Sequence, residues 1–546
     1  MRKSVVPAWA GALAGLVAGA VALGVAQLVA AVVRPEAFPV VAVGDAVVDL
    51  SPAPVKDWAI ATFGENDKTV LVAGVLVLLA AAAAGLGVLA TRRIGYGRAG
   101  LAAFAVIGVW AALTRPDAGP ADVLPTVAGL GVGIWVLGFL VRRAYGTAPA
   151  VAQEPARPGA TGSGPAGDGS DGDGPAGDGP SEWPTVHGAD SVFDRRRLLV
   201  GAAGGVVVAG ASTFLGRAWS GSEAIDAARG GVTLPKAATP AAPLPQGVDF
   251  RLNGLTPFVT KNRDFYRVDT ALILPRIDPK EWRLRIHGMV DRPIELTYAD
   301  LLKRPLTEAD VTLTCVSNEV GGDLAGNARW LGVPLAAVLR EAGVQRDADM
   351  LLSTSDDGWT CGTPVDVVMD GRNALLAVGM NGEPLPLTHG FPVRQVVPGL
   401  YGYVSATKWV VDIKVTRFDR DEAYWTPRGW SAKGPIKTQS RIDLPGDGAK
   451  VAAGRTTIAG VAWAQHTGVD AVEVRVDGGA WQQARLAQAP TADTWRQWAL
   501  DWQATPGEHT IQVRATDAAG RTQTEEKAPV APDGASGWHT ISVRVG

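Results

Sequence analysis

Residues 380–410 read MNGEPLPLTHGFPVRQVVPGLYGYVSATKWV, and they carry the most specific signal in the chain. This stretch brings His389, Arg394 and Lys408 close together among Gly and Pro turns. An arginine offers a fork of donors that suits phosphate oxygens, and a lysine adds a compact positive charge. A core histidine bonded to the backbone is the alternative for His389, but three groups that can be cationic beside Gly-Pro turns favour a role in ligand binding.

A second signal surrounds Cys315, which ends the strand-like run VTLT and opens the Gly-rich loop CVSNEVGG. This position predicts a sulfur at the mouth of a sheet, with a buried structural thiol as the alternative. The chain has only one other cysteine, Cys361, so it has no disulfide scaffold, zinc ribbon or C-x-x-C-H haem attachment site. Cys361 is expected to be a small buried hydrophobe.

Both segments resemble the sulfite oxidase family of molybdopterin-dependent oxidoreductases, which includes the catalytic subunit of periplasmic methionine sulfoxide reductase. In that family an Arg-Trp-x-Gly-like element follows the metal-binding cysteine, and here it is Arg329, Trp330 and Gly332. The resemblance implies a molybdenum-molybdopterin cofactor whose metal is bound by Cys315, with Arg329 and Trp330 as further catalytic residues. A soft thiolate suits a metal that is already held by dithiolene sulfurs.

The resemblance also implies which residues hold the cofactor. Residues 380–410 match the family's pterin clamp, KNRDFYRVDT at 261–270 matches its first cofactor loop, and LLSTSDDGW at 351–359 matches the strand after the cysteine. In the segment 351–359 Ser355 is the residue expected to contact the pterin, with Asp357 as a close second choice. The implied cofactor-binding residues are Asn262, Tyr266, Arg267, Cys315, Ser355, His389, Arg394, Ala406, Thr407 and Lys408.

The chain departs from the family pattern at the substrate site. Vertebrate-type sulfite oxidases follow the metal cysteine with Asn-Arg-Arg, whereas this chain has Asn318, Glu319 and Val320. Their arginine before a C-terminal Trp-His pair is also missing, because APDGASG precedes Trp538 here. Lys261 is the nearest candidate to replace the substrate arginine of the first loop. The set of cations around an anionic substrate is therefore expected to be depleted.

The C-terminal half has the mixed composition of a globular enzyme and divides into two predicted domains. Residues 246–425 alternate strands and helices, which indicates an α+β cofactor domain. Residues 426–546 carry short alternating strands such as TTIAGVAWA and HTIQVRAT, which predict an all-β immunoglobulin-like sandwich. In sulfite oxidases this domain is the dimerisation module, so the resemblance implies a homodimer.

The N-terminal region, residues 1–145, predicts a four-helix membrane bundle. Its apolar runs are long enough to span a bilayer, with the third marginal, and a mixed, partly acidic loop separates the first two. Arginines flank alternate ends of the runs, which by the positive-inside rule places the N-terminus and residue 145 in the cytoplasm. The runs cover residues 8–33, 69–90, 99–114 and 122–141.

A predicted disordered linker rich in Gly, Pro and Asp covers residues 146–193. Residues 194–216 then begin DRRRLLVG and resemble an internal twin-arginine signal, which forms a fifth helix before a second linker at 217–245. The same arginines also fit the positive-inside flank of an ordinary fifth helix. Both interpretations place the enzyme-like half on the extracytoplasmic side of the cell membrane.

Composition and charge argue against nucleic-acid binding and against a haem in the bundle. The chain has 546 residues and a net charge of -3, without a basic stripe for nucleic acid. The first 186 residues contain no histidine, so no bis-histidine haem is expected in the bundle, and an external electron partner, a cytochrome or a quinone-linked protein, is implied.

The leading hypothesis is a two-electron oxygen-atom transfer enzyme that acts on a small molecule, similar to sulfite oxidases. S-oxide or N-oxide reduction by the same type of site remains open. An alternative from another class is a non-catalytic, membrane-tethered surface binding module in which Cys315 and Cys361 form a disulfide.

Overall fold

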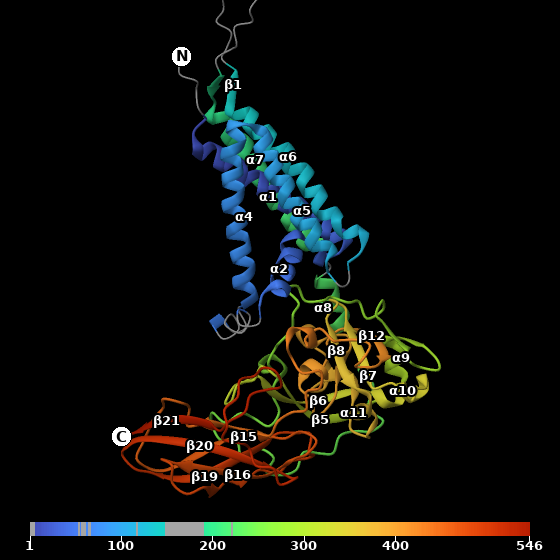
Figure 1. The fold of residues 1–546 in the computed structure, drawn as a ribbon, viewed down its shortest axis with the longest axis vertical. Coiled ribbons are helices and arrows are strands. Elements are labelled where there is room, and N and C mark those ends of the chain that lie inside the picture. Colours follow the sequence, from blue (N-terminus) through green and yellow to red (C-terminus); the bar gives the residue numbers. More distant parts are fainter. Residues whose placement is uncertain are drawn as a thin grey trace, which may run out of the picture. The chain divides into compact units, whose positions relative to one another are not determined.

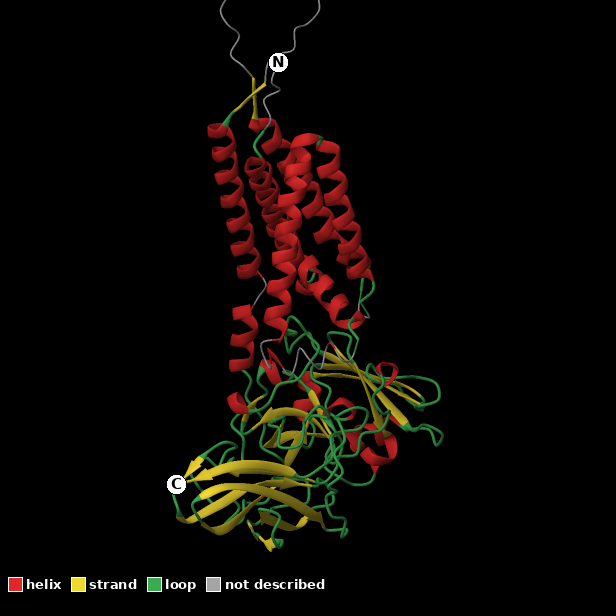
Figure 2. Cartoon of the chain, turned by 60° about the vertical axis from the view of Figure 1, so that its left-hand side comes forward, coloured by secondary structure: helices red, strands yellow, loops and turns green. Residues whose placement is uncertain are grey.

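The structure is a computed structural model, and the residues it describes are 6–52, 55, 62–63, 67–115, 118–147, 191–219 and 222–546. The chain divides into two compact units. The first comprises Met1–Pro39, Ala73–Trp110 and Val123–Gly216, and the second comprises Val40–Val72, Ala111–Asp122 and Arg217–Gly546. Long helices make up most of the first unit and strands dominate the second (Figure 1, Figure 2).

The five long helices have the length and composition of membrane spans. They are α1 (Ala8–Val33), α4 (Asp67–Arg92), α5 (Ile94–Leu113), α6 (Leu124–Ala144) and α7 (Arg195–Trp219). The candidate spans within them measure 20 to 26 residues, or about 30 Å or more at 1.5 Å per residue. The third apolar run, expected to be marginal, belongs to a 20-residue helix because α5 begins at Ile94.

Small residues allow the helix backbones of the first unit to approach closely. A Cβ atom on Gly15 of α1 would lie 1.9 Å from the Ala83 carbonyl oxygen of α4, and one on Gly87 would lie 2.0 Å from the Gly11 oxygen. A Cβ on Gly129 of α6 would lie 2.6 Å from the Ala22 oxygen of α1. Such close approach is the usual way in which membrane helices gain packing energy, since lipid supplies no hydrophobic drive between them.

The segment between the first two spans is helical in part, so its prediction as a loop was wrong. Helix α2 (Pro39–Leu50) buries Val40, Val41 and Gly44. A Cβ on Gly44 would lie 2.6 Å from the Leu272 side chain, and Asp49 accepts a hydrogen bond from the Tyr424 hydroxyl. The acidic residues suggested a loop, but packing within the second unit overrides that local preference.

Most of the predicted linker at 146–193 lies outside the described residues. Its described ends form the short strands β1 (Tyr145–Thr147) and β2 (Ser191–Phe193), which pair antiparallel. Near its start the second linker, residues 217–245, contains a helix, α8 (Ser222–Gly230). Both segments are therefore partly ordered.

Two five-stranded sheets and three helices form the cofactor domain. One sheet has the order β4 (Ile294–Thr297), β3 (Arg283–Gly288), β12 (Val410–Thr416), β7 (Met350–Ser355) and β8 (Thr360–Pro364), and only β3 and β12 are parallel. The other has β10 (Glu383–Pro384), β9 (Leu375–Met380), β6 (Ala325–Pro334) and β5 (Thr307–Thr314), with β11 (Arg394–Val396) also paired to β9. The helices are α9 (Tyr298–Lys303), α10 (Leu335–Ala342) and α11 (Val365–Met369).

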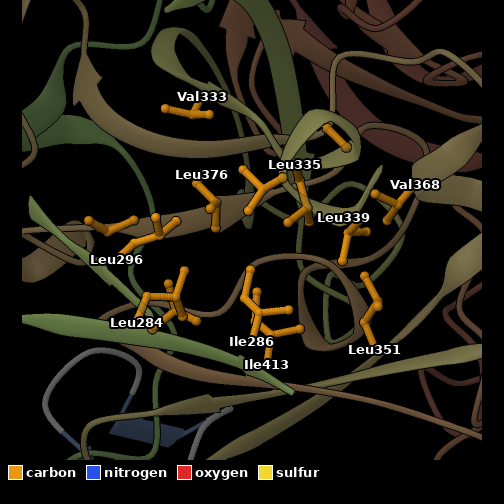
Figure 3. Packing of buried hydrophobic residues seen from close by; sticks show 14 of the residues in the cluster. Leu284, Ile286, Leu296, Val333, Leu335, Leu339, Leu351, Val368, Leu376 and Ile413 are labelled. Carbon is orange, nitrogen blue, oxygen red and sulfur yellow. The ribbon is translucent and has the colours of Figure 1, made fainter. Parts of the chain in front are cut away.

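Local signals explain where these helices begin and end. Thr297 and Asp300 form a reciprocal capping box at the start of α9. Helix α10 ends at Gly343, which has φ +72° and donates to the carbonyls of Leu339 and Arg340. The largest core of the domain lies against these elements, and Figure 3 shows its side chains, which include Ile286, Ile413 and Leu339. Alternate burial of Leu284 and Ile286 along β3 follows the period of two expected of a strand.

The C-terminal strands form two sheets that pack face to face, as expected for an immunoglobulin-like sandwich. Ile458 and Trp498 of one sheet share a core with Val472, Ile511 and Val513 of the other. The first sheet contains β13 (Gln439–Leu444), β15 (Gly454–Trp463), β19 (Arg496–Ala504) and β18 (Arg485–Leu486). The second contains β14 (Lys450–Val451), β21 (His539–Val545), β20 (Gly507–Asp517), β16 (Val469–Val476) and β17 (Gln482–Gln483).

The close contact between α1 and α4 gives a first prediction. Gly87→Ala should lower the free energy of unfolding of the bundle by about 1–3 kcal/mol, because the added methyl group overlaps the Gly11 carbonyl. Gly85→Ala is the matched control, since no described atom lies within 4 Å of its Cβ position. Unfolding by sodium dodecyl sulfate, followed by circular dichroism, measures both variants. Equal stability of the two would contradict the packing of these helices.

Candidate functional site

Cys315 follows β5 directly and opens a tightly closed loop. Its backbone N–H donates to the Leu324 carbonyl at 2.9 Å, and the Asn318 N–H donates to the Cys315 carbonyl at 3.1 Å. The Asn318 side-chain oxygen accepts from the Leu324 N–H at 2.8 Å, which closes the loop from within. The cysteine itself is buried. These contacts fix the sulfur in one position at the end of the strand.

The immunoglobulin-like domain braces this loop from behind. Gln465 donates to the Thr314 hydroxyl at 3.0 Å, and the Trp495 N–H donates to the Thr312 hydroxyl at 2.8 Å. Arg441 donates to the Gly322 carbonyl in the loop at 2.8 Å. The two domains therefore share the hydrogen bonds that hold the strand before Cys315 and the loop after it.

The Cys315 thiol sits in surroundings that keep it protonated on its own. Burial raises its pKa, while hydrogen bonds from Ser317 and the positive charge of Lys408 act in the opposite direction and do not outweigh it. A bound metal ion deprotonates such a thiol outright. The site therefore suits a sulfur that acts as a metal ligand better than a free thiolate.

Arg394, at the start of β11, is a buried cation without a counter-ion among the described residues. Only 4 % of it is exposed, its Nη1 donates to the His389 carbonyl at 3.2 Å, and its Nε has no partner. The guanidinium lies over the Trp330 ring, 4.9 Å from its centre. Burial lowers the pKa of Arg394 to about 10, with Tyr266 acting against this. A buried charge of this kind is costly unless an anion offsets it.

His389 ends the 3₁₀ turn Leu387–His389 and presents an unused nitrogen. Its Nε2 lies 2.9 Å from the Asn262 carbonyl and so donates to it, while Nδ1 is buried without a partner. Burial lowers the pKa of His389 to about 3, and the charges of Arg394 and Lys408 add to this. The ring is therefore neutral on its own, and an adjacent phosphate would favour its protonated form.

Gly390 allows these groups to meet. Its φ of +104° is in the left-handed region, and a Cβ there would lie 3.0 Å from both the Lys408 Cα and the Arg394 Cβ. A residue with a side chain would push the segments of His389, Arg394 and Lys408 apart.

Lys408 shares one carboxylate with two other cations. Its Nζ donates to Asp269 at 2.9 Å, Arg267 donates to the same carboxylate at 2.8 Å, and Lys68 from the first turn of α4 also pairs with it. Burial would raise the pKa of Asp269, but the three cations outweigh it and hold that pKa well below its usual range. Burial lowers the pKa of Lys408 to about 8, against the pull of Asp269.

Four of the predicted cofactor-binding residues carry a buried polar atom without a hydrogen-bond partner. They are Ser355 Oγ, His389 Nδ1, Arg394 Nε and Thr407 Oγ1. Buried polar groups are normally satisfied, so such a set on neighbouring segments indicates that a polar ligand completes it. The mixture of a cation, hydroxyls and an imidazole fits a cofactor that carries both phosphate and pterin groups, so the residues present fit molybdopterin.

The other predicted cofactor residues differ in the contacts that they already make within the protein. Tyr266 stacks on Phe265 at 5.2 Å and lies near Cys315 and Arg394, and burial raises the pKa of its phenol so that it stays protonated. Ala406 is buried beside the turn Gly402–Val404. The Asn262 amide is already occupied, donating to Glu383 at 2.6 Å and accepting from Asn381 at 2.8 Å. Asp357 accepts from the Trp359 N–H in a turn.

The residues predicted to be catalytic beside Cys315 have other contacts. Arg329 forms a two-pronged pair with Asp310, at 2.9 Å and 2.7 Å, so its charge is already balanced. Trp330 is fully buried, donates to the Val311 carbonyl and supports Arg394 with its ring face. In this arrangement Trp330 positions a cation of the site, and Arg329 ties β6 to β5.

Glu319 stands where vertebrate-type sulfite oxidases have the first arginine after the metal cysteine and its asparagine. Its side chain is exposed and lines a cavity of about 450 Å³ together with Lys527, Trp538 and His539 of the sandwich domain. Gly321 in the same loop has φ +82° and packs against the His539 ring. The side chain at this position therefore lines this solvent-exposed cavity.

The proposed disulfide between Cys315 and Cys361 is wrong, because both thiols are free. Cys361 is fully buried on β8 and lies 3.6 Å from the Thr363 hydroxyl. Burial raises its pKa to about 11, as expected for a small buried hydrophobe.

Sequence reasoning missed the groups that hold the predicted residues in place. Asp269 lies inside the quoted segment 261–270, two residues after Arg267, but nothing in the pattern identified it as the partner of Lys408. Lys68 lies 201 residues before Asp269 and gave no signal. The Gln395 amide joins Ser353 and Thr363 beneath the site at 2.6 Å and 2.7 Å, which becomes visible only in the folded chain.

Comparison with known proteins agrees with this geometry. Residues 271–425 match the family model of the oxidoreductase molybdopterin binding domain, and residues 439–513 match a bacterial Ig domain. Mouse mitochondrial sulfite oxidase is 33% identical over 342 residues, which cover 53% of this chain and 62% of that protein. The uncharacterized oxidoreductase YuiH of Bacillus subtilis is 34% identical over 157 residues, 29% of this chain and 76% of that protein.

Among solved structures, the sulfane dehydrogenase SoxCD of Paracoccus pantotrophus matches with a TM-score of 0.47 and 26% identity, covering 53% of this chain and 82% of that one. The fold and the site define a molybdopterin-binding oxidoreductase domain joined to an immunoglobulin-like domain. The chain belongs to the sulfite oxidase family of molybdopterin-dependent oxidoreductases. It spans 62% of the length of the mouse sulfite oxidase.

The unpaired cation at the centre of the site gives a second prediction. Arg394→Gln should lower cofactor occupancy about tenfold or more, since a charge-assisted contact is lost, while the occupied fraction keeps its turnover. Molybdenum per chain and turnover per molybdenum measure the two effects separately. Arg285→Gln is the matched control, because Arg285 is exposed on β3 and pairs with Asp412 of the neighbouring strand β12. Full occupancy with lost turnover would contradict the assignment.

Proposed function

We propose that the protein is an oxidoreductase that transfers an oxygen atom to or from a small substrate, with molybdopterin as its cofactor and Cys315 as the protein ligand of the molybdenum. The observation that carries this proposal is the set of four unsatisfied buried atoms on Ser355, His389, Arg394 and Thr407, of which Arg394 Nε belongs to a buried cation. Buried polar atoms without partners are costly, and a ligand with phosphate and pterin groups would satisfy them.

The chain's own residues have distinct parts in this proposal. Arg394 and Lys408 hold the cofactor phosphate. The negative charge of the phosphate favours the protonated form of His389, which then also donates to it. Ser355 and Thr407 offer hydroxyls to the pterin edges, and Cys315 holds the metal with a soft sulfur. When bound, the cofactor supplies two-electron redox chemistry, and the protein supplies position and electrostatics. Trp330 and Phe265 exclude water from the cations behind the site.

The cations that could surround an anionic substrate are engaged or exposed. Arg329 is neutralised by Asp310, and Arg263 is exposed and pairs with Asp264. Lys261 is exposed. Arg394 and Lys408 belong to the cofactor in this proposal. An uncharged acceptor such as an S-oxide or N-oxide therefore suits the site better than a doubly charged anion, whose desolvation needs cationic donors.

Position in the cell is part of the same proposal. The arginine-rich ends of the apolar helices favour a cytoplasmic N-terminus and a cytoplasmic residue 145. Helix α7, which begins at Arg195, then carries the cofactor and sandwich domains to the outer face of the membrane, as a twin-arginine signal or as an ordinary span. Electrons reach or leave the site through an external partner, a cytochrome or a quinone-linked protein. A homodimer through the sandwich domain completes the expectation from the family.

Replacement of the proposed metal ligand is the direct test. Cys315→Ser should leave a folded protein with turnover reduced by about a thousandfold or more, because a hard hydroxyl replaces a soft thiolate. Cys361→Ser is the matched control, since it makes the same replacement at the other buried thiol, which contacts Thr363 and lies beside Thr407. Turnover with an artificial redox dye, together with molybdenum content, measures both variants. Normal turnover in Cys315→Ser, or no molybdenum in the mature wild-type protein, would favour a non-catalytic binding module.

Substrate preference gives the next prediction. Sulfite should be oxidised with kcat/KM below about 10⁴ M⁻¹s⁻¹, at or under the low end of the usual enzyme range. Each cationic donor missing from a dry pocket costs about 1.5–3 kcal/mol for an anion. Steady-state kinetics on molybdenum-loaded protein compare sulfite with a panel of S-oxides and N-oxides. A sulfite value of about 10⁶ M⁻¹s⁻¹ or more would show that other residues rebuild the cation set.

A further inference from the structure

A groove of about 740 Å³ runs along helix α6 within the first unit. Its lining combines four arginines with three aromatic residues, and no acidic side chain is among the described residues that form it. The arginines come from three helices, since Arg98 belongs to α5, Arg142 and Arg143 to α6, and Arg197 to α7. The cofactor site described above uses none of these residues.

Two of the guanidinium groups converge on one point of α6. The Nη2 atom of Arg98 and that of Arg142 lie 3.6 Å and 3.8 Å from the position that a Cβ on Gly138 would occupy. Two like charges that approach the same point repel each other, and more strongly beside apolar helices than in water. Neither group has an acidic partner among the described residues, whereas Arg197 pairs with Asp194 at 3.2 Å. An anion between Arg98 and Arg142 would offset this repulsion.

Topology alone does not account for the convergence. The positive-inside rule explains why arginines collect at one end of the bundle, but it leaves their side chains free to spread into solvent. Gly138 is buried on α6 and leaves space for both guanidinium groups beside its backbone. A glycine at this place gives room for an anion between the arginines.

Toward Gly131 the wall of the groove is apolar. From Arg142 it extends to Gly131, roughly 16 Å along the helix at 1.5 Å per residue. Trp135 is 66% exposed on this wall and its ring stacks on that of Phe139, with 5.5 Å between the ring centres. The Arg143 guanidinium lies over the Phe139 ring, 4.5 Å from its centre. A cationic end that continues into an aromatic and aliphatic wall matches a phosphate joined to an acyl chain.

We propose that this groove binds an anionic phospholipid, with the headgroup phosphate between Arg98 and Arg142 and an acyl chain along α6 past Trp135. Basic pockets between membrane helices are suited to such headgroups. Free phosphate shares the headgroup chemistry, but it would gain nothing from the apolar wall. The lipid would join α5 to α6 at the end of the bundle from which α7 also begins.

Lipid binding by the full-length protein tests this proposal. In mild detergent, native mass spectrometry should detect phosphatidylglycerol bound at least tenfold more tightly than phosphatidylcholine. The double variant Arg98→Gln/Arg142→Gln should lose this preference by about tenfold or more, since two charge-assisted contacts disappear. Arg93→Gln is the matched control, because Arg93 is exposed between α4 and α5 and lies outside the groove. The charge-preserving variant Arg98→Lys/Arg142→Lys should keep most of the preference.

Competition separates the possible sources of the anion. An excess of inorganic phosphate should leave the phosphatidylglycerol adduct in place, and full displacement would show a simple anion site and overturn the lipid assignment. Equal binding of both lipids by the wild-type protein, or an unchanged preference in the double variant, would also overturn it. Circular dichroism verifies that the bundle is folded, and Arg142→Gln alone replaces the double variant if that variant does not fold.

Discussion

The buried guanidinium of Arg394 is the constraint on which the functional half of the protein depends. A charge removed from water without a partner destabilises the fold by several kcal/mol, and the described residues offer it only the His389 carbonyl and the face of Trp330. The fold tolerates this because the surrounding strands are held by many other contacts, including the pairing of β11 with β9. In the proposed role of Arg394, an anion bound beside it would offset this cost.

The neighbouring cation, Lys408, differs from Arg394 because it has a carboxylate partner. Lys408 shares Asp269 with Arg267 and Lys68, so its charge is balanced before any ligand binds. A phosphate must compete with Asp269 for Lys408, whereas Arg394 is available at once. In the proposed role of these residues, Arg394 would supply most of the attraction for the phosphate, because no carboxylate already balances its charge. Lys68 connects this balance to the first turn of α4.

The sequence supports predictions for the parts of the candidate site that depend on local residue order. The segments around His389, Arg394 and Lys408 carry their chemistry within 20 residues, and four of the ten predicted cofactor residues have unsatisfied buried atoms. Contacts between distant segments were out of reach, because no local pattern encodes them. Asp310 neutralises Arg329 across two paired strands, and α2 forms where acidic residues suggested a loop, because Gly44 packs against Leu272.

The sandwich domain has a part in the site that its usual description as a dimerisation module leaves out. Gln465, Trp495 and Arg441 hydrogen-bond to the strand that precedes Cys315 and to the loop that follows it. A metal ligand must hold its sulfur within a few tenths of an ångström to keep its geometry, and a loop with only its own contacts would move more than that. The position of Cys315 therefore depends on both domains, so the sandwich would be needed for the cofactor site even in a monomer.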